Sequence, residues 1–129
     1  MGTILLIEDN HDCARMVNKI IEPHGHTVVH AATALDGLKL ARSLRPDLIL
    51  LDMDLPDLEG KVVVNQLRVD PSFRTIPIVA FTAENSSRAK RMALAFGCTD
   101  FISKPIDTRT FPTQIETLMT AGARDTLPV

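Results

Sequence analysis

Short apolar runs in this chain of 129 residues are followed by side chains that could bind a metal ion and a phosphoryl group. They are the acidic pair Glu8-Asp9, then Asp52, Thr82 and Lys104. Two carboxylates held about 4 Å apart repel each other by about 4 kcal/mol at an effective dielectric constant of about 20. A hard divalent cation relieves this repulsion, and a site with few oxygen ligands beside phosphate suits Mg²⁺. These residue types therefore indicate phosphoryl chemistry at a magnesium site.

Asp52 is the natural nucleophile of such a site. The carboxylates of Glu8, Asp9 and Asp52 carry three negative charges. Mg²⁺ and Lys104 would balance these charges before phosphate arrives, so an incoming phosphoryl group would meet two cations that stabilise its equatorial oxygens. The hydroxyl group of Thr82 can donate a hydrogen bond to one of those oxygens. In-line attack by Asp52 would give an aspartyl phosphate.

The elements predicted along the chain would bring these side chains together. Apolar and β-branched runs predict five strands, over residues 3–7, 27–31, 48–51, 76–81 and 100–103. Apolar residues at helical spacing predict helices over residues 11–22, 34–44, 58–69 and 86–96, and a fifth over 108–119 with Pro112 in its first turn. Strict alternation of strand and helix indicates an α/β fold with a doubly wound parallel sheet. Such sheets bind ligands at the carboxyl ends of their strands, where these polar residues lie.

Composition and charge indicate which binding partners and which cellular location to expect for this chain. The chain has a net charge of −2 and a pI near 6.0, which gives no reason to expect binding to nucleic acid or to an anionic membrane. The first residues show no signal-peptide pattern, and every apolar run is too short to cross a bilayer. Cys13 and Cys98 lie far apart in sequence, and we interpret both as reduced thiols. We therefore expect a cytoplasmic protein.

Four segments of the chain carry a family resemblance. The segments ILLIEDN, ILLDMDLPDLEG, IVAFTA and GCTDFISKPI resemble the signature segments of response-regulator receiver domains, over about residues 3–120. The separations of 30 residues from Asp52 to Thr82 and 22 residues from Thr82 to Lys104 are also typical of that family. The resemblance implies a flavodoxin-like receiver fold with five helices and the strand order 2-1-3-4-5.

The resemblance also implies a set of metal ligands. Asp9 would bind Mg²⁺ directly, and Glu8 would act mainly through metal-bound water. Asp52 would be a metal ligand as well as the phosphorylated residue. The backbone carbonyl of Asp54 would complete the ligands from the protein.

Further roles carried over from the family concern the phosphoryl group and the switch. Thr82 and Lys104 would act with Asp52 as catalytic residues that hold phosphoryl oxygens. Phe101 occupies the position of the switch aromatic residue and would respond to movement of Thr82. The peptide bond before Pro105 would be cis.

The family resemblance implies a signalling module whose only catalysis is its own phosphorylation and dephosphorylation. Its phosphodonor would be a histidine kinase or a phosphotransfer protein. Its downstream protein target would bind the face formed by residues 86–96, 100–103 and 108–119. We expect a receiver domain over residues 1–121, a disordered tail over 122–129 and, since the chain ends soon after the fifth helix, no output domain.

Two alternatives within the same fold remain open. The chain could be the receiver segment of a hybrid histidine kinase, because such segments have similar EDN, AFTA and ISKPI motifs. It could also be a phosphate-independent pseudo-receiver that acts as a binding module, although neither the acidic pair, nor the acceptor Asp52, nor Lys104 has been lost.

Two other patterns are discounted. Asp52-Met53-Asp54 fits the start of haloacid-dehalogenase-type phosphatases, but there the motif should end the first strand, and here it ends the third. His24, His26 and His30 could suggest a transition-metal site. His26 and His30 would share one face of the second strand, but His24 lies in the preceding turn, so we interpret them as surface histidines on an edge strand. His11 is expected in a solvated first turn, with contact to the pocket rim as the alternative.

Overall fold

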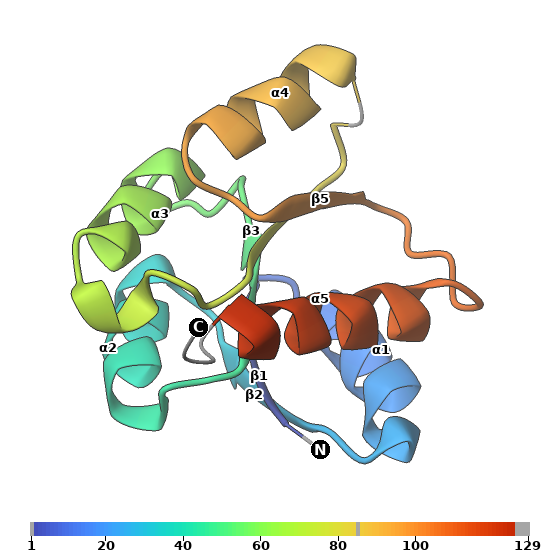
Figure 1. The fold of residues 1–129 in the computed structure, drawn as a ribbon. Helices are drawn as coiled ribbons and strands as arrows, with labels where there is room; N and C mark the ends of the chain where they lie inside the picture. Colours follow the sequence, from blue (N-terminus) through green and yellow to red (C-terminus); the bar gives the residue numbers. More distant parts are fainter. Residues whose placement is uncertain (1, 85, 126–129) are drawn as a thin grey trace.

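The computed structural model describes residues 2–84 and 86–125 (Figure 1). Within these residues the strands are β1 (Thr3–Ile7), β2 (Thr27–Ala31), β3 (Leu48–Asp52), β4 (Ile78–Thr82) and β5 (Asp100–Ser103). The α-helices are α1 (His11–Ile21), α2 (Ala34–Leu44), α3 (Gly60–Arg68), α4 (Ser87–Ala95) and α5 (Phe111–Asp125). Two short 3₁₀ helices cover Glu22–His24 and Pro71–Phe73. None of the helices in this part of the chain is long and apolar enough to cross a membrane.

The strands form one parallel sheet in the order β2-β1-β3-β4-β5, which confirms the expected topology. Every residue of β3 and β4 is buried, as a strand covered on both faces requires. Alternate side chains of β1 enter two separate core clusters. One cluster includes residues of α2, α3 and α4, and the other includes residues of α1 and α5 (Figure 1).

Several element boundaries differ from the predicted ones for physical reasons. Strand β4 begins at Ile78 rather than at residue 76, since Pro77 has no N–H group to donate. Helix α5 begins at Phe111 rather than at residue 108, because Asp107 accepts from the N–H of Arg109 and forms a turn there. Helix α5 ends at Asp125, beyond the predicted end at residue 119. Of the tail predicted over 122–129, residues 126–129 lie outside the described part of the chain.

Loops at the carboxyl edge of the sheet are held by side-chain caps. The side-chain Oδ1 of Asn10 accepts from the N–H of Cys13 at 2.9 Å and caps α1. The Asp57 carboxylate, in the loop after β3, accepts from the first N–H groups of α2, at 3.0 and 3.1 Å. Gly60 lets α3 start against that loop, because a Cβ atom there would lie 3.0 Å from the Met53 Cα. The segment after Asp52 is therefore fixed from both sides.

Arg68, the last residue of α3, joins the loops at the opposite edge of the sheet. Its guanidinium donates to the carbonyl oxygens of Gly97 at 3.0 Å, Phe73 at 2.6 Å and Ile76 at 2.8 Å. It also donates to the Thr99 hydroxyl at 3.2 Å. One side chain thus connects the loops that precede β4 and β5 to the end of α3.

We predict that Arg68→Ala lowers the free energy of unfolding by about 2–3 kcal/mol, because partly buried carbonyl groups lose their donor. Urea denaturation of both proteins measures this loss. Arg15→Ala is the matched control, since Arg15 is 77% exposed and, among the residues that the structure describes, forms an ion pair with Asp12 alone. It should cost about 0.5 kcal/mol or less. Equal losses for the two variants would contradict the role given to Arg68.

Candidate functional site

The sheet brings the predicted carboxylates to one edge. Glu8 and Asp9 follow β1 and Asp52 ends β3, and β1 and β3 are neighbours in the sheet. One carboxylate oxygen from each of the three residues lies within 4.8 Å of the other two. Glu8 and Asp52 are buried and Asp9 is exposed. An oxygen-only donor set that contains two buried carboxylates fits a hard divalent cation such as Mg²⁺.

Lys104 reaches this cluster from the end of β5. Its N–H donates to the Thr82 carbonyl oxygen at 2.7 Å, which holds the lysine backbone against β4. Its Nζ lies 2.5 Å from Glu8 Oε1 and 3.7 Å from Asp52 Oδ2. Partial burial would lower the pKa of Lys104, but the hydrogen bond to Glu8 and the nearby carboxylate of Asp52 raise it. Lys104 is therefore a fixed positive charge. The peptide bond between Lys104 and Pro105 is cis.

The two buried carboxylates differ in protonation. Burial and the hydrogen bond with Glu8 raise the pKa of Asp52 to about 7. Burial would also raise the pKa of Glu8, but the hydrogen bonds with Asp52 and Lys104 outweigh it and lower this pKa to about 2. Without a cation, Asp52 is therefore partly protonated near neutral pH. A bound cation favours the ionised carboxylates and would displace this proton.

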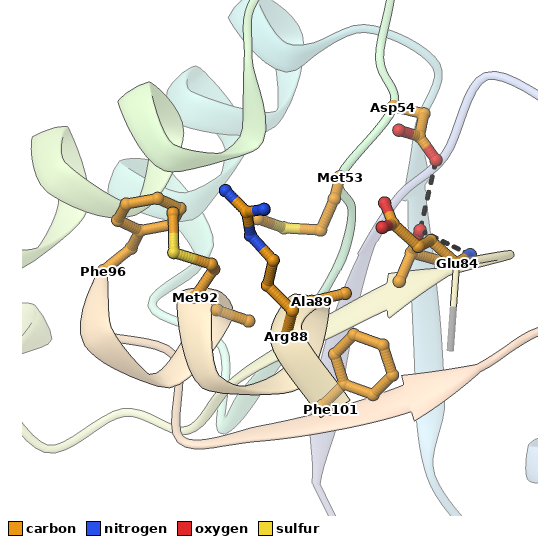
Figure 2. Close-up of a pocket in the computed structure, with 10 residues that line it drawn as sticks. Met53, Asp54, Glu84, Arg88, Ala89, Met92, Phe96 and Phe101 are labelled. Carbon is orange, nitrogen blue, oxygen red and sulfur yellow. Dashed lines mark hydrogen bonds between the residues drawn. The ribbon is translucent and has the colours of Figure 1, made fainter. Parts of the chain in front are cut away.

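The hydroxyl group of Thr82 links the acidic cluster to the loop after β3. Its Oγ1 donates to Asp54 Oδ2 at 3.2 Å and accepts from the Glu84 N–H at 3.2 Å (Figure 2). The Asp54 N–H in turn donates to Asp52 Oδ1 at 2.9 Å. A chain of hydrogen bonds thus runs from Asp52 through Asp54 to Thr82.

A groove lies between this chain of hydrogen bonds and α4. It has a volume of about 270 Å³, with apolar walls from Met53, Met92 and Phe96 and with Arg88 among its polar residues (Figure 2). The ring of Phe101, on β5, also lines the groove and is half-buried. Phe101 thus shares a groove with Thr82 and Asp54, and the carboxylates of the metal cluster do not line that groove.

The histidines differ from the prediction. The side chain of His26 is only 9% exposed, and its Nε2 lies 3.3 Å from Glu116 Oε1. His24 Nδ1 lies 3.6 Å from the same oxygen. The interpretation of these residues as surface histidines is therefore wrong for His26, because α5 brings an acidic residue that is 90 positions away in sequence. His30 is half-buried and contacts the Glu8 carbonyl.

Sequence reasoning also missed the place of Cys13. Both described cysteines are free, and burial together with the nearby Glu8 carboxylate raises the pKa of Cys13 to about 12. The thiol therefore stays protonated beside the acidic cluster. Its position in the first turn of a helix that follows an acidic pair was the available signal.

Comparisons with known proteins agree on one family. The model of the response regulator receiver domain matches residues 4–116. The polar-differentiation response regulator DivK of Brucella anthropi is 35% identical over 116 residues, which is 90% of this chain and 92% of DivK. The chemotaxis response regulator CheY4 of Vibrio cholerae has a TM-score of 0.86 at 26% identity, over 92% of this chain and 98% of that one.

A receiver taken from a larger signalling protein is equally similar in structure. The signal receiver domain of a signal transduction histidine kinase from Syntrophus aciditrophicus has a TM-score of 0.86 at 28% identity, over 100% of this chain and 97% of that one. The chain therefore belongs to the response-regulator receiver domain family, the signalling modules of two-component systems.

We predict that, without a divalent cation, Asp52→Asn raises the free energy of unfolding near pH 8 by about 2–4 kcal/mol. The folded-state pKa of Asp52, about 7, lies above its ordinary value of 3.8, so the folded protein binds more protons than the unfolded chain between these values. The stability of the unchanged protein therefore falls as pH rises through this interval, and the gain from asparagine, which does not titrate, should grow.

Denaturation at several pH values above about 5 measures this effect, because the lowered pKa of Glu8, about 2, keeps that residue's contribution constant there. Asp12→Asn is the matched control, since the Asp12 side chain is 84% exposed. If the gain in the free energy of unfolding from Asp52→Asn does not vary with pH, then burial and Glu8 do not raise the pKa of Asp52.

Proposed function

We propose that the chain is a magnesium-dependent phosphoacceptor in which Asp52 receives a phosphoryl group from a histidine kinase or a phosphotransfer protein. One observation carries the proposal: Asp52, 3% exposed, lies at the carboxyl edge of the sheet within 4.8 Å of two other carboxylates and 3.7 Å from the Lys104 ammonium. In the transfer, a bond forms between an Asp52 oxygen and phosphorus. The bond from phosphorus to the donor's histidine nitrogen breaks, and that nitrogen keeps the electron pair.

Asp9, Glu8, Asp52 and the backbone carbonyl of Asp54 are the residues that would hold Mg²⁺. When bound, the cation supplies positive charge to the carboxylates and to the phosphoryl oxygens. Asp9 is the most accessible of the three carboxylates, which suits a direct ligand. Glu8 already accepts from Lys104, so it is better suited to act through water.

Lys104 and Thr82 both have hydrogen bonds that an incoming phosphoryl group could replace. The Lys104 ammonium would move from Glu8 Oε1 to an oxygen of the phosphoryl group on Asp52. The Thr82 hydroxyl would leave Asp54 and donate to another phosphoryl oxygen. Both residues then stabilise charge that develops during transfer, and the module catalyses only its own phosphorylation and dephosphorylation.

Movement of Thr82 is the proposed link to a downstream protein. Because Phe101 and Thr82 line the same groove, a shift of Thr82 changes the space that the Phe101 ring can enter. The target would bind the face formed by α4, β5 and α5. A hollow of about 390 Å³ on this face, lined mainly by threonine and other polar residues with Leu118, offers room for a partner side chain.

The similarity to DivK over most of its length supports the role of a response regulator. The similarity to a kinase receiver keeps the alternative of a receiver segment in a longer chain. Retention of Asp52 and Lys104 in contact range argues against a phosphate-independent pseudo-receiver. We further propose a cytoplasmic location and no binding to nucleic acid or membrane, in line with the net charge of −2.

We predict that acetyl phosphate with Mg²⁺ adds one phosphoryl group, a mass increase of about 80 Da, which hydroxylamine removes. Asp52→Asn and removal of divalent cations by EDTA should each abolish the adduct, because the nucleophile or its charge balance is lost. Asp12→Asn, on the exposed side of α1, should be labelled like the unchanged protein. Intact-mass spectrometry is the measurement, and labelling of Asp52→Asn at the normal rate would refute the proposed nucleophile.

We predict that Phe101→Ala leaves the rate of acetyl phosphate labelling within about threefold, because the ring touches none of the reacting atoms. Phosphorylation should nevertheless shift the methyl resonances of Met53 and Met92 less in this variant, since both side chains line the groove that the ring would enter. The difference in a partner's binding free energy between the phosphorylated and the unphosphorylated protein should also become smaller in this variant. Such differences are usually about 1–3 kcal/mol. A large loss of thermal stability with undiminished methyl shifts would make Phe101 an ordinary core residue.

A further inference from the structure

Residues of strand β2 form hydrogen bonds with both the N–H and the carbonyl group of Glu8. The Glu8 N–H donates to the Ala31 carbonyl oxygen at 2.9 Å, and His30 Nε2 lies 2.6 Å from the Glu8 carbonyl oxygen. A carbonyl oxygen can only accept, so Nε2 must carry the proton and donate it. His30 thus fixes the peptide group that connects Glu8 to Asp9.

His11 supports the ring of His30 from the first turn of α1. The two ring centroids are 5.4 Å apart and the ring planes meet at 87°, which is an edge-to-face arrangement. His11 follows Asn10, which caps α1 and whose N–H donates to Glu8 Oε2 at 3.2 Å. The two histidines therefore stand on β2 and α1, on either side of the segment Glu8–Asn10.

The backbone decides the direction of the Asp9 carboxylate more than that of the Glu8 carboxylate. The Glu8 carboxylate accepts from Lys104 and from the Asn10 N–H. In the described parts of the chain no hydrogen bond or ion pair holds the Asp9 carboxylate, which is exposed. The direction of that carboxylate is then set by the peptide that precedes it.

We propose that His30 is a positioning residue of the divalent-cation site. Its donation to the Glu8 carbonyl fixes the Glu8–Asp9 peptide and so directs the Asp9 carboxylate toward the cation, with His11 as its steric support. This inference rests on the proposed function, since the cation concerned is the one bound beside Asp52. Loss of an outer-shell hydrogen bond typically weakens metal binding by about 10–100-fold. Because His30 acts on a peptide rather than on a ligand atom, the expected loss is about three- to tenfold.

The test compares variants that keep or remove the donor. In His30→Gln the amide nitrogen can occupy the place of Nε2, whereas His30→Leu has similar size and no donor. The dissociation constant for Mg²⁺, measured without phosphodonor by calorimetry and by amide chemical shifts, should stay within about twofold for glutamine and rise about three- to tenfold for leucine. His24→Leu, in the 3₁₀ helix that precedes β2, is the matched control and should bind Mg²⁺ normally.

Two further measurements separate positioning from packing. The ¹⁵N shifts of His30 should show the tautomer protonated at Nε2, and His11→Phe should bind Mg²⁺ better than His11→Ala, since only the former keeps an aromatic ring. If His30→Leu does not fold, His30→Asn takes its place, because the shorter amide cannot reach the Glu8 carbonyl.

Several results would overturn the inference. One is a leucine variant that melts earlier but binds Mg²⁺ with unchanged affinity, which would make His30 a packing residue only. A glutamine variant as weak as the leucine variant, or a tautomer protonated at Nδ1, would also overturn it. The proposed function fails separately: in that case the unchanged protein itself would show no Mg²⁺ binding and no labelling of Asp52.

Discussion

The repulsion between the carboxylates of Glu8, Asp9 and Asp52 is the constraint on which the rest of the site depends. Neighbouring strands β1 and β3 force these groups together, and two of the three are buried. Lys104 offsets part of this charge at 2.5 Å from Glu8, and it reaches the cluster because its backbone is tied to the Thr82 carbonyl. Burial and the neighbouring Glu8 carboxylate together raise the pKa of Asp52. A divalent cation would complete this charge balance and leave two positive charges, its own and that of Lys104, to face an incoming phosphoryl group.

The same constraint explains how a local event can reach a distant surface. Asp54 connects Asp52 to the Thr82 hydroxyl, and Thr82 shares a groove with Phe101 and α4. Any ligand that draws the hydroxyl toward Asp52 must break the contact with Asp54 and alter that groove. The loop after β3 can transmit this change without unravelling, since Asp57 anchors it to α2 and Gly60 seats it against α3. Rigid supports around one replaceable hydrogen bond favour two discrete arrangements over a gradual deformation.

The sequence was informative where chemistry follows strand ends. Apolar runs followed by Asp52, Thr82 and Lys104 predicted both the sheet and the edge at which these residues meet, and the family resemblance supplied the strand order. The sequence was uninformative where the hydrogen-bond partner of a side chain is a backbone atom or a residue of a distant helix. His30 bonds to a carbonyl group, which leaves no trace in residue identity, and Glu116 approaches His26 only through the placement of α5. The start of β4 was missed because the missing N–H of Pro77 outweighed an apolar pattern.

In the proposed function, Asp52 itself carries the phosphoryl group, and this can be measured directly. Reduction of the phosphorylated protein with borohydride converts an acyl phosphate to an alcohol, which marks the modified residue permanently. Peptide mass mapping then locates that residue without relying on any substitution. We expect reduction at Asp52 alone. Reduction at Asp9, at Asp54 or at no aspartate in the phosphorylated protein would contradict it.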